Sequence, residues 1–361
     1  MRSFSSPRVA SRGARLLLCS LALATQGCYA LHAASGQLHV WWGREPIDEV
    51  LRRPDLDPTR RERLELVLAV RRFAFEELGL TRSDSYSYFY DTGEGYVAYN
   101  VSACAPDAFA PRVWTFPLVG AVPYLGYFDL ALAQEQARAL AEEGLDVLVL
   151  PVPAYSTLGW FADPVFSTML DEDEAELAST IVHELTHGTV WIPGDVELNE
   201  NMASFVGDRG AEAFFLARGG PQDPALLAAA RRNEEQSLFN AALAELRDDL
   251  ARVYESTGRR SDKLAYKAQA VAAFRRRYAE ELAPRLSDDR YGWVLSEEID
   301  LNNAVLLSFR RYHGDEELLD AVYRRCGSSL RRFIAAIREA AEADEPRAAL
   351  EALAAGGPFG D

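Results

Sequence analysis

Apolar residues in the segment 45–80 recur at steps of three and four, which is the spacing of an amphipathic helix. A turn with two prolines, residues 54–58, interrupts this pattern, and Gly79 stands where the helix would end. The apolar positions after the turn are Leu64, Leu66, Val67, Val70 and Phe73. We therefore expect a helical segment on each side of the turn.

Extended structure is expected next. Residues 81–130 are rich in tyrosine, phenylalanine and valine, with a turn-forming stretch at 91–95 and a second extended stretch at 113–127. An alanine- and leucine-rich helix is expected at 129–143. The nearly continuous apolar run 145–152 then predicts a buried strand.

Beyond Asp171 almost the whole pattern is helical, including long segments near 223–257 and 261–283, and no internal repeat is visible. This order predicts an α+β fold that is predominantly α. Its mixed α/β part would span residues 28–190 and its all-helical part residues 191–361, around a shared middle.

The first 27 residues resemble an export signal. They hold four arginines and no acidic residue, and the apolar run 16–24 is shorter than the roughly 20 residues of a spanning helix. Gly27-Cys28 at the cleavage point resembles a bacterial lipobox, in which the cysteine is lipidated. We favour a lipid anchor at Cys28, and the alternative is an ordinary cleaved signal with Cys28 incidental.

The charge of the chain is strongly acidic. Its 55 Asp and Glu residues against 38 Lys and Arg give a formal charge of −17, which becomes about −21 once the four arginines of the signal are removed. Phosphate contacts need a concentrated basic face, so we expect no nucleic-acid partner. We expect an exported protein of the cell envelope, anchored at the outer membrane and facing the periplasm.

Three cysteines remain after cleavage. With Cys28 acylated, Cys104 and Cys326 are the one pair that could form a disulfide. An oxidising compartment would permit the bond, but spacing along the sequence provides no geometry for it, so the question stays open at this point.

The segment with the clearest chemistry is His183-Glu184-Leu185-Thr186-His187, an H-E-x-x-H pattern within the predicted α/β part. Four acidic residues, 171–174, crowd the expected start of its helix. The buried stripe of that helix would be Ala178, Ile181, Val182 and Leu185. His183 and His187 are four residues apart, which places both imidazoles on one face of the helix.

A catalytic zinc ion usually takes three protein ligands and leaves one position for water. Glu200 is the candidate for the third, on a following helix with Asp195 as its expected N-cap. Small residues on the same face would let this helix approach the first one closely; they are Ala203, Ser204, Gly207 and Ala211. The alternative is that Glu200 is a solvated surface carboxylate.

This set of residues predicts a catalytic centre. Zn²⁺ held by His183, His187 and Glu200 would lower the pKa of a bound water to about 7, and Glu184 would accept the proton of that water as general base. Tyr312 and His313 are candidates for stabilising the oxyanion of the reaction. The alternative for both is simple packing or surface exposure.

His183-Glu184-x-x-His187 followed by Asn199-Glu200-x-x-Ala203 resembles the gluzincin metallopeptidases, of which thermolysin is the familiar member. More closely, the chain resembles a family of predicted bacterial aminopeptidases that are secreted or lipid-anchored. The stretches that carry this second resemblance are Gly36-Gln37-Leu38, Pro46-Ile47-Asp48-Glu49-Val50-Leu51, Pro153-Ala154-Tyr155-Ser156-Thr157-Leu158-Gly159-Trp160-Phe161, Asn199-Glu200 and Asn302-Asn303-Ala304. Together they span most of the mature chain.

The resemblance implies a gluzincin-like fold whose active-site cleft lies between an α/β part and a helical part. It also implies that Ala154, Tyr155 and Ser156 line that cleft and that substrate pairs with them as an added strand. Two features depart from the pattern. Twelve residues separate His187 from Glu200, fewer than in thermolysin-like enzymes. The Gly-x-Met-Glu-Asn segment with which known gluzincin aminopeptidases hold a substrate's amino terminus is missing.

We therefore expect a zinc metallopeptidase that acts on peptides or proteins, most simply an aminopeptidase. An endopeptidase acting on one protein is an alternative that the sequence does not separate from it. A zinc-containing lipoprotein that binds peptides without cutting them is another alternative. The presence of Glu184 beside the expected water favours catalysis over a structural zinc site.

Overall fold

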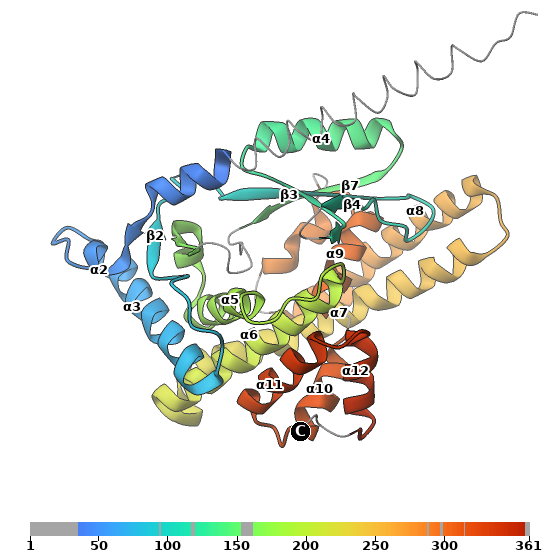
Figure 1. Cartoon of the computed structure of the whole chain (residues 1–361). Coiled ribbons are helices and arrows are strands. Elements are labelled where there is room, and N and C mark those ends of the chain that lie inside the picture. Colours follow the sequence, from blue (N-terminus) through green and yellow to red (C-terminus); the bar gives the residue numbers. More distant parts are fainter. Residues whose placement is uncertain are drawn as a thin grey trace, which may run out of the picture.

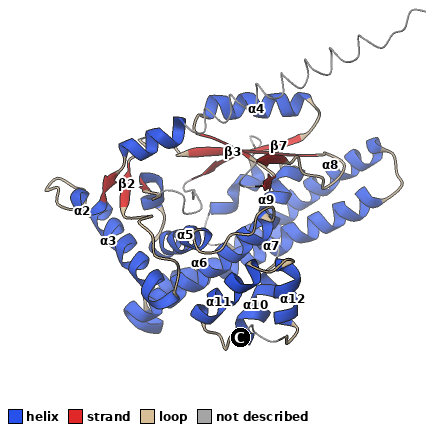
Figure 2. Cartoon of the chain, in the orientation of Figure 1, coloured by secondary structure: helices blue, strands red, loops and turns tan. Residues whose placement is uncertain are grey.

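The structure is a computed structural model, and it describes residues 35–93, 95–116, 120–152, 162–286, 289–296, 299–313 and 315–357. Most of these residues are helical, and every strand among them precedes Ser167 (Figure 2). The expected α+β, predominantly α class is therefore confirmed. None of the described helices has the length and apolar character that crossing a bilayer requires.

The strands are short and form three small sheets. They are β1 (Glu45–Pro46), β2 (Tyr88–Tyr90), β3 (Ala98–Cys104), β4 (Trp114–Phe116), β5 (Gly120–Val122), β6 (Leu125–Tyr127), β7 (Asp146–Val152) and β8 (Val165–Phe166). The strand orders are β1-β2-β8, β6-β3-β7 and β4-β5. The β6-β3-β7 sheet is antiparallel, with Asn100 of β3 opposite Gly126 on one side and Leu150 on the other.

The larger α-helices follow the predicted segments closely. They are α3 (Pro58–Phe73), α4 (Leu130–Glu142), α5 (Glu174–His187), α6 (Val196–Gly219), α7 (Pro224–Glu255), α8 (Arg260–Arg277), α9 (Asn303–His313), α10 (Glu316–Arg325), α11 (Leu330–Ala341) and α12 (Pro346–Ala354). A short helix, α2 (Ile47–Val50), precedes the turn with two prolines. A π-helical turn extends α3 to Leu78, and Gly79 ends it in the left-handed region with φ of +82°.

The elements stack in layers, with α5 and α6 at the centre (Figure 1). Helix α4 covers one face of the β6-β3-β7 sheet, and α10, α11 and α12 lie on the opposite side of the central pair. The main hydrophobic core surrounds α5 and α6 and includes side chains from both sides of residue 190. The two predicted parts thus share a core, while the boundary at residue 190 remains a prediction.

A buried polar cluster joins the helical region to the sheet. Asp146 at the start of β7 forms an ion pair with Lys267 of α8 and accepts a hydrogen bond from the backbone N–H of Asn303 at 2.8 Å. The Asn303 amide donates to the carbonyl of Ala105 at 2.9 Å, and its oxygen accepts from the hydroxyl of Tyr254 at 3.0 Å. The N-terminal end of α9 is therefore fixed to the sheet edge.

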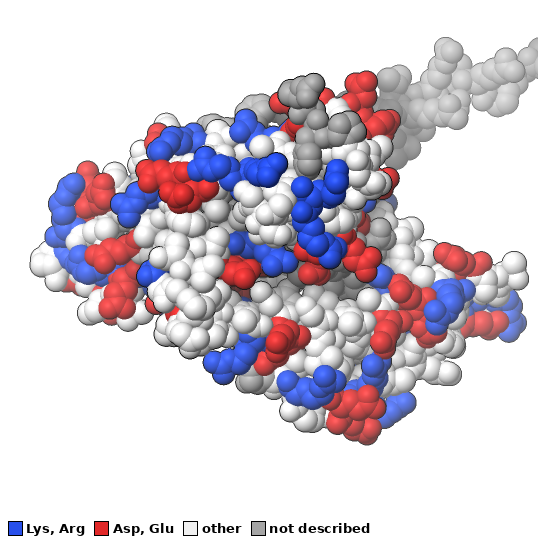
Figure 3. All heavy atoms as spheres, turned by 90° about the horizontal axis from the view of Figure 1, so that it is seen from below, with Lys and Arg blue, Asp and Glu red and all other residues white. Residues whose placement is uncertain are grey.

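Charged residues mix on the molecular surface around α10 and α12. Arg347 forms a bidentate pair with Asp315 at 2.8 and 3.0 Å, and Arg209 lies 3.4 Å from Asp320. Figure 3 shows acidic and basic side chains interspersed over the face seen from below. Solvent-exposed pairs contribute about 0–1 kcal/mol each, so the buried apolar contacts of these helices matter more for their stability.

The structure shows no disulfide between the two cysteines in the described part of the chain. Cys104 and Cys326 are both buried and free. The Cys104 thiol lies 3.3 Å from the carbonyl of Ala108, and burial raises the pKa of this thiol to about 12. Neither residue is paired with the other.

Helix α5 begins at Glu174, the last residue of the acidic run 171–174, and Asp173 is its N-cap, which accepts from the backbone N–H groups of Ala175 and Glu176 at 2.9 Å. Glu172 stands just before it and accepts a hydrogen bond from the hydroxyl of Thr180 at 2.9 Å. Burial, reinforced by the nearby Glu176 carboxylate, raises the pKa of Glu172 to about 8.

This raised pKa predicts a pH-dependent stability. The folded state binds the proton of Glu172 more tightly than the unfolded state, in which the pKa of a glutamate is about 4.3. The protonated carboxyl therefore contributes its full stabilisation below about pH 4, and this stabilisation is lost as the pH rises to about 8. Glu172→Gln keeps the acceptor but cannot ionise. We expect the free energy of unfolding of the variant, relative to that of the native protein, to increase by on the order of 1–3 kcal/mol when the pH is raised from 5 to 8. Denaturant unfolding at both pH values measures this, and an equal difference at both would contradict it.

Candidate metal centre

The connection between α5 and α6 is short and is held by one side chain. Asn199, in the first turn of α6, accepts a hydrogen bond from the backbone N–H of Ile192 at 2.8 Å and donates to the carbonyls of Ile192 at 2.7 Å and Asp195 at 2.9 Å. Asp195 caps the helix as expected, accepting from the N–H of Leu198 at 3.0 Å. This fully bonded amide fixes where α6 starts relative to the end of α5.

Small residues let the two helices approach closely, as the sequence predicts. A Cβ atom added at Gly207 would lie 2.8 Å from the carbonyl oxygen of Ser179 and 3.2 Å from Cβ of His183. One added at Gly210 would lie 2.8 Å from a methyl group of Val182. At Gly207 the obstacle is backbone, so the close approach of α6 to α5 leaves no room for a side chain there. At Gly210, which was not among the predicted small residues, neighbouring side chains would have to shift.

Three donor atoms converge where the helices meet. Nε2 of His183 lies 3.1 Å from Nε2 of His187, and Oε2 of Glu200 lies 3.4 Å from the first nitrogen and 3.8 Å from the second. Zinc ligands at about 2.0–2.1 Å in a tetrahedron stand about 3.3 Å apart. The three donor atoms are therefore close enough together to hold one cation, and without an ion the same distances are those of a hydrogen bond between the imidazoles and of ion pairs with Glu200.

The charge state of Glu200 suits a cation. Burial alone would raise the pKa of this carboxyl, but the imidazoles of His187 and His183 outweigh burial and hold the pKa well below its usual range. The side chain is only 11% exposed, so the ionised carboxylate lies almost out of solvent. A carboxylate with two imidazole nitrogens is one of the donor sets found in catalytic zinc sites.

Glu184 lies beside this set. Burial raises the pKa of its carboxyl to about 7; the neighbouring His183 acts in the opposite direction, and the carboxylates of Glu200 and Asp163 raise the pKa further. Its Oε2 atom is buried and accepts no hydrogen bond from the residues that the structure describes. Such a carboxyl is suited to exchange a proton near neutral pH.

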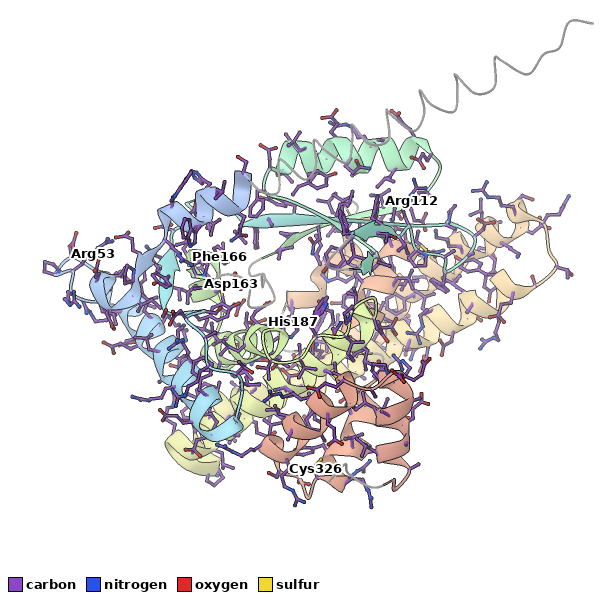
Figure 4. The ribbon with its side chains drawn as sticks, viewed as in Figure 1. Arg53, Arg112, Asp163, Phe166, His187 and Cys326 are labelled. Atoms are coloured by element: carbon purple, nitrogen blue, oxygen red, sulfur yellow. The ribbon has the colours of Figure 1, made fainter. Side chains whose placement is uncertain are left out.

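Figure 4 places His187 near the middle of the molecule, on the side of α5 toward β3 and β7. The ring of Trp191 meets the His187 ring edge to face, with centroids 5.7 Å apart. Nδ1 of His187 is buried and has no hydrogen-bond partner among the described residues. The ring is therefore oriented by packing rather than by a bond to that nitrogen.

Two residues near the donors were not predicted as part of the site. The hydroxyl of Ser204 lies 3.4 Å from Nδ1 of His183, the nitrogen that faces away from the other donors. Such a partner orients a metal-binding imidazole. Ser204 follows Glu200 by four residues on one helical face, a spacing that could have identified it. Asp163, which is buried and labelled in Figure 4, comes from a segment distant in sequence, so no local pattern indicates it.

Several predicted residues cannot be compared with the donor set. Ala154, Tyr155, Ser156 and Cys28 lie outside the described residues. Tyr312 lies in α9, and the structure describes its backbone but not its side chain. His183, His187 and Glu200 are brought together, with Glu184 next to them.

A family model described as "Putative aminopeptidase" matches residues 28–350 of the chain. The chain belongs to that family. No curated protein matches it. No solved structure matches it either. Membership supports peptidase activity, and the donor set of this chain could hold a metal.

Gly207→Ala tests the close approach of the two helices. In a helix interior, alanine is normally more stable than glycine by about 1 kcal/mol. Here, however, the Cβ of the alanine would lie 2.8 Å from the carbonyl oxygen of Ser179. We expect the change to destabilise the protein by about 1–3 kcal/mol and to weaken zinc binding. Gly258→Ala is the control, since its Cβ would meet only the Ser256 hydroxyl at 3.4 Å. Thermal unfolding and zinc titration against a chelating dye measure both effects, and unchanged zinc affinity would contradict the prediction.

Proposed function

We propose that this family member is a zinc-dependent metallopeptidase, and specifically an aminopeptidase. The observation that carries the proposal is the triangle of donor atoms from His183, His187 and Glu200, whose sides of 3.1–3.8 Å match the spacing of tetrahedral zinc ligands. Membership in an aminopeptidase family supports the peptide as substrate class.

His183, His187 and Glu200 would hold the ion, which, when bound, acidifies water and polarises a carbonyl. Glu184 would act as general base, because burial raises its pKa to about 7 and a carboxyl with that pKa can both take and return a proton near neutral pH. The proton taken from water would pass to the departing amine. Ser204 would keep His183 in position through its Nδ1 atom.

The remaining machinery is proposed from the sequence. Tyr312 would stabilise the oxyanion, and Ala154, Tyr155 and Ser156 would line the cleft and pair with the substrate backbone. The expected neighbour of that segment is β7, whose last residues Pro151 and Val152 lead directly into it. Because β7 belongs to the sheet that stands over α5 in Figure 1, substrate held along its end would lie on the donor side of the helix.

Glu184→Gln separates catalysis from metal binding. Amide and carboxyl have the same shape, but the amide cannot accept a proton, so we expect zinc to remain bound and peptide hydrolysis to fall by about 10²–10⁴-fold. The matched control is Glu62→Gln, an exposed glutamate on α3, which should change neither property. Metal analysis of the purified mature protein and digestion of a peptide library provide the two measurements.

Each outcome of this experiment has a separate meaning. Zinc absent at stoichiometric level would reject the metal centre. Stoichiometric zinc without Glu184-dependent cleavage would instead indicate a peptide-binding protein. Loss of a single N-terminal residue from each free-amine peptide, with N-acetylated peptides left intact, would establish an aminopeptidase, whereas internal cleavage would establish an endopeptidase.

We also propose that the protein is exported and held at the outer membrane by acyl chains on Cys28, where it faces the periplasm. Cys28→Ser would remove the anchor, so we expect most of the protein to move from the membrane to the soluble fraction. Fractionation with and without high salt measures the change. A protein that remains membrane-bound in the same proportion as the native chain would rule out the lipid anchor.

A further inference from the structure

A short helix near the beginning of the described chain, residues 35–43, carries its large apolar side chains on the outside. Trp42 is 74% exposed, Leu38 45% and Trp41 43%. These residues are spaced i, i+3 and i+4, so they share one face of the helix. We call Leu38, Trp41 and Trp42 the Trp patch. Large apolar side chains exposed next to one another are typical of an interaction surface.

The opposite face of this helix packs on the protein. Val40 is buried in the main core. A Cβ atom at Gly36 would overlap the ring of Phe128, and one at Gly43 would lie 2.7 Å from the ring of Tyr90. The helix is thus seated closely through small residues and Val40, and the Trp patch lies on the side of the helix that the described residues leave exposed.

The Trp patch is supported by neighbouring groups. The guanidinium of Arg44 lies over the Trp41 ring at 5.6 Å and over the Tyr88 ring at 4.2 Å, and it donates to the carbonyl of Ala162. Two more exposed apolar side chains, Leu130 and Leu132, follow Phe128 at the start of α4. In Figure 1 this helix, drawn in blue, lies near that end of α4.

We propose that the Trp patch lies against the membrane and inserts into the interfacial region of the bilayer. Three arguments favour a lipid surface as the occupant, and the third rests on the proposed anchor at Cys28. Trp is the side chain best suited to the boundary between headgroups and acyl chains. The face combines leucine with tryptophan on a helix anchored from behind, as an interfacial helix does. Finally, the position of the helix in the chain keeps it near the proposed anchor.

That position sets a limit on distance. Seven residues lead from Cys28 to Ser35, and they span at most about 25 Å when fully extended. A lipid on Cys28 therefore holds the Trp patch within that distance of the bilayer. The acyl chains would supply most of the affinity, and the Trp patch would fix the face that the enzyme turns toward the membrane.

The charge of the protein predicts the character of this binding. With about −21 charges in the mature chain, attraction to anionic headgroups cannot drive it. We expect the protein to bind zwitterionic vesicles at least as well as vesicles that contain anionic lipid. We also expect high salt not to release it from zwitterionic vesicles, because burial of apolar surface is insensitive to screening.

The test uses residues 28–361 carrying Cys28→Ser and measures their binding to lipid vesicles. Because the variant cannot be acylated, any binding comes from the protein surface itself. Flotation with phosphatidylcholine vesicles, with and without phosphatidylglycerol, gives the partition coefficient. We expect Trp41→Ser with Trp42→Ser to lower it by at least about tenfold. Leu216→Ser, an equally exposed leucine at the far end of α6, is the control and should leave it unchanged.

Three results would overturn the proposal: no vesicle binding by the Cys28→Ser chain, equal losses in the double variant and the Leu216→Ser control, or a dimer in solution that the double variant abolishes. The last result would assign the Trp patch to a second copy of the chain. Thermal unfolding of every variant confirms folding. Since the measurement does not use peptidase activity, its failure leaves the proposed function intact, and loss of that function leaves this inference testable.

Discussion

Close contact between α5 and α6 is the constraint on which the site depends. Two donor nitrogens belong to one helix and the donor oxygen to the other, so their separation is set by how near the helix axes can come. Gly207 and Gly210 permit the approach, and Asn199 fixes the register with three hydrogen bonds. The main core then surrounds this pair with helices and small sheets, which hold it in place.

The same packing explains the electrostatics of the centre. Burial opposes charge on both Glu184 and Glu200, yet the two carboxyls respond differently. Glu200 lies against two imidazoles and stays ionised, whereas Glu184 is opposed by the carboxylates of Glu200 and Asp163 and keeps a pKa near neutrality. This difference in pKa agrees with the different tasks proposed for the two glutamates, Glu200 as a ligand and Glu184 as a proton carrier.

Local patterns predict much of this molecule. Apolar periodicity places α3, α4, α7 and β7 within a few residues, and the His183–His187 spacing places two donors on one face. The small residues beside Glu200 indicate the close helix pair from the sequence alone. Contacts between segments that are far apart in the sequence leave no local pattern, so they could not be predicted in this way. Asp163 reaches Glu184 from another part of the chain, and the joining of α9 to β7 depends on a contact between Asp146 and Asn303, 157 residues apart.

The hydrogen bonds of Asn199 bear on which metal the donor set could accept. A connector held this firmly leaves the donors little freedom to spread or contract, so a cation held by them would meet donor atoms at nearly fixed separations. Large, oxygen-seeking ions such as Ca²⁺ are disfavoured by that size and by the two nitrogens. First-row divalent ions of similar radius all fit, and they differ in intrinsic affinity in an order that the protein does not control. If the donor set holds zinc as proposed, the supply of each metal in the compartment where the chain folds would contribute to that selection.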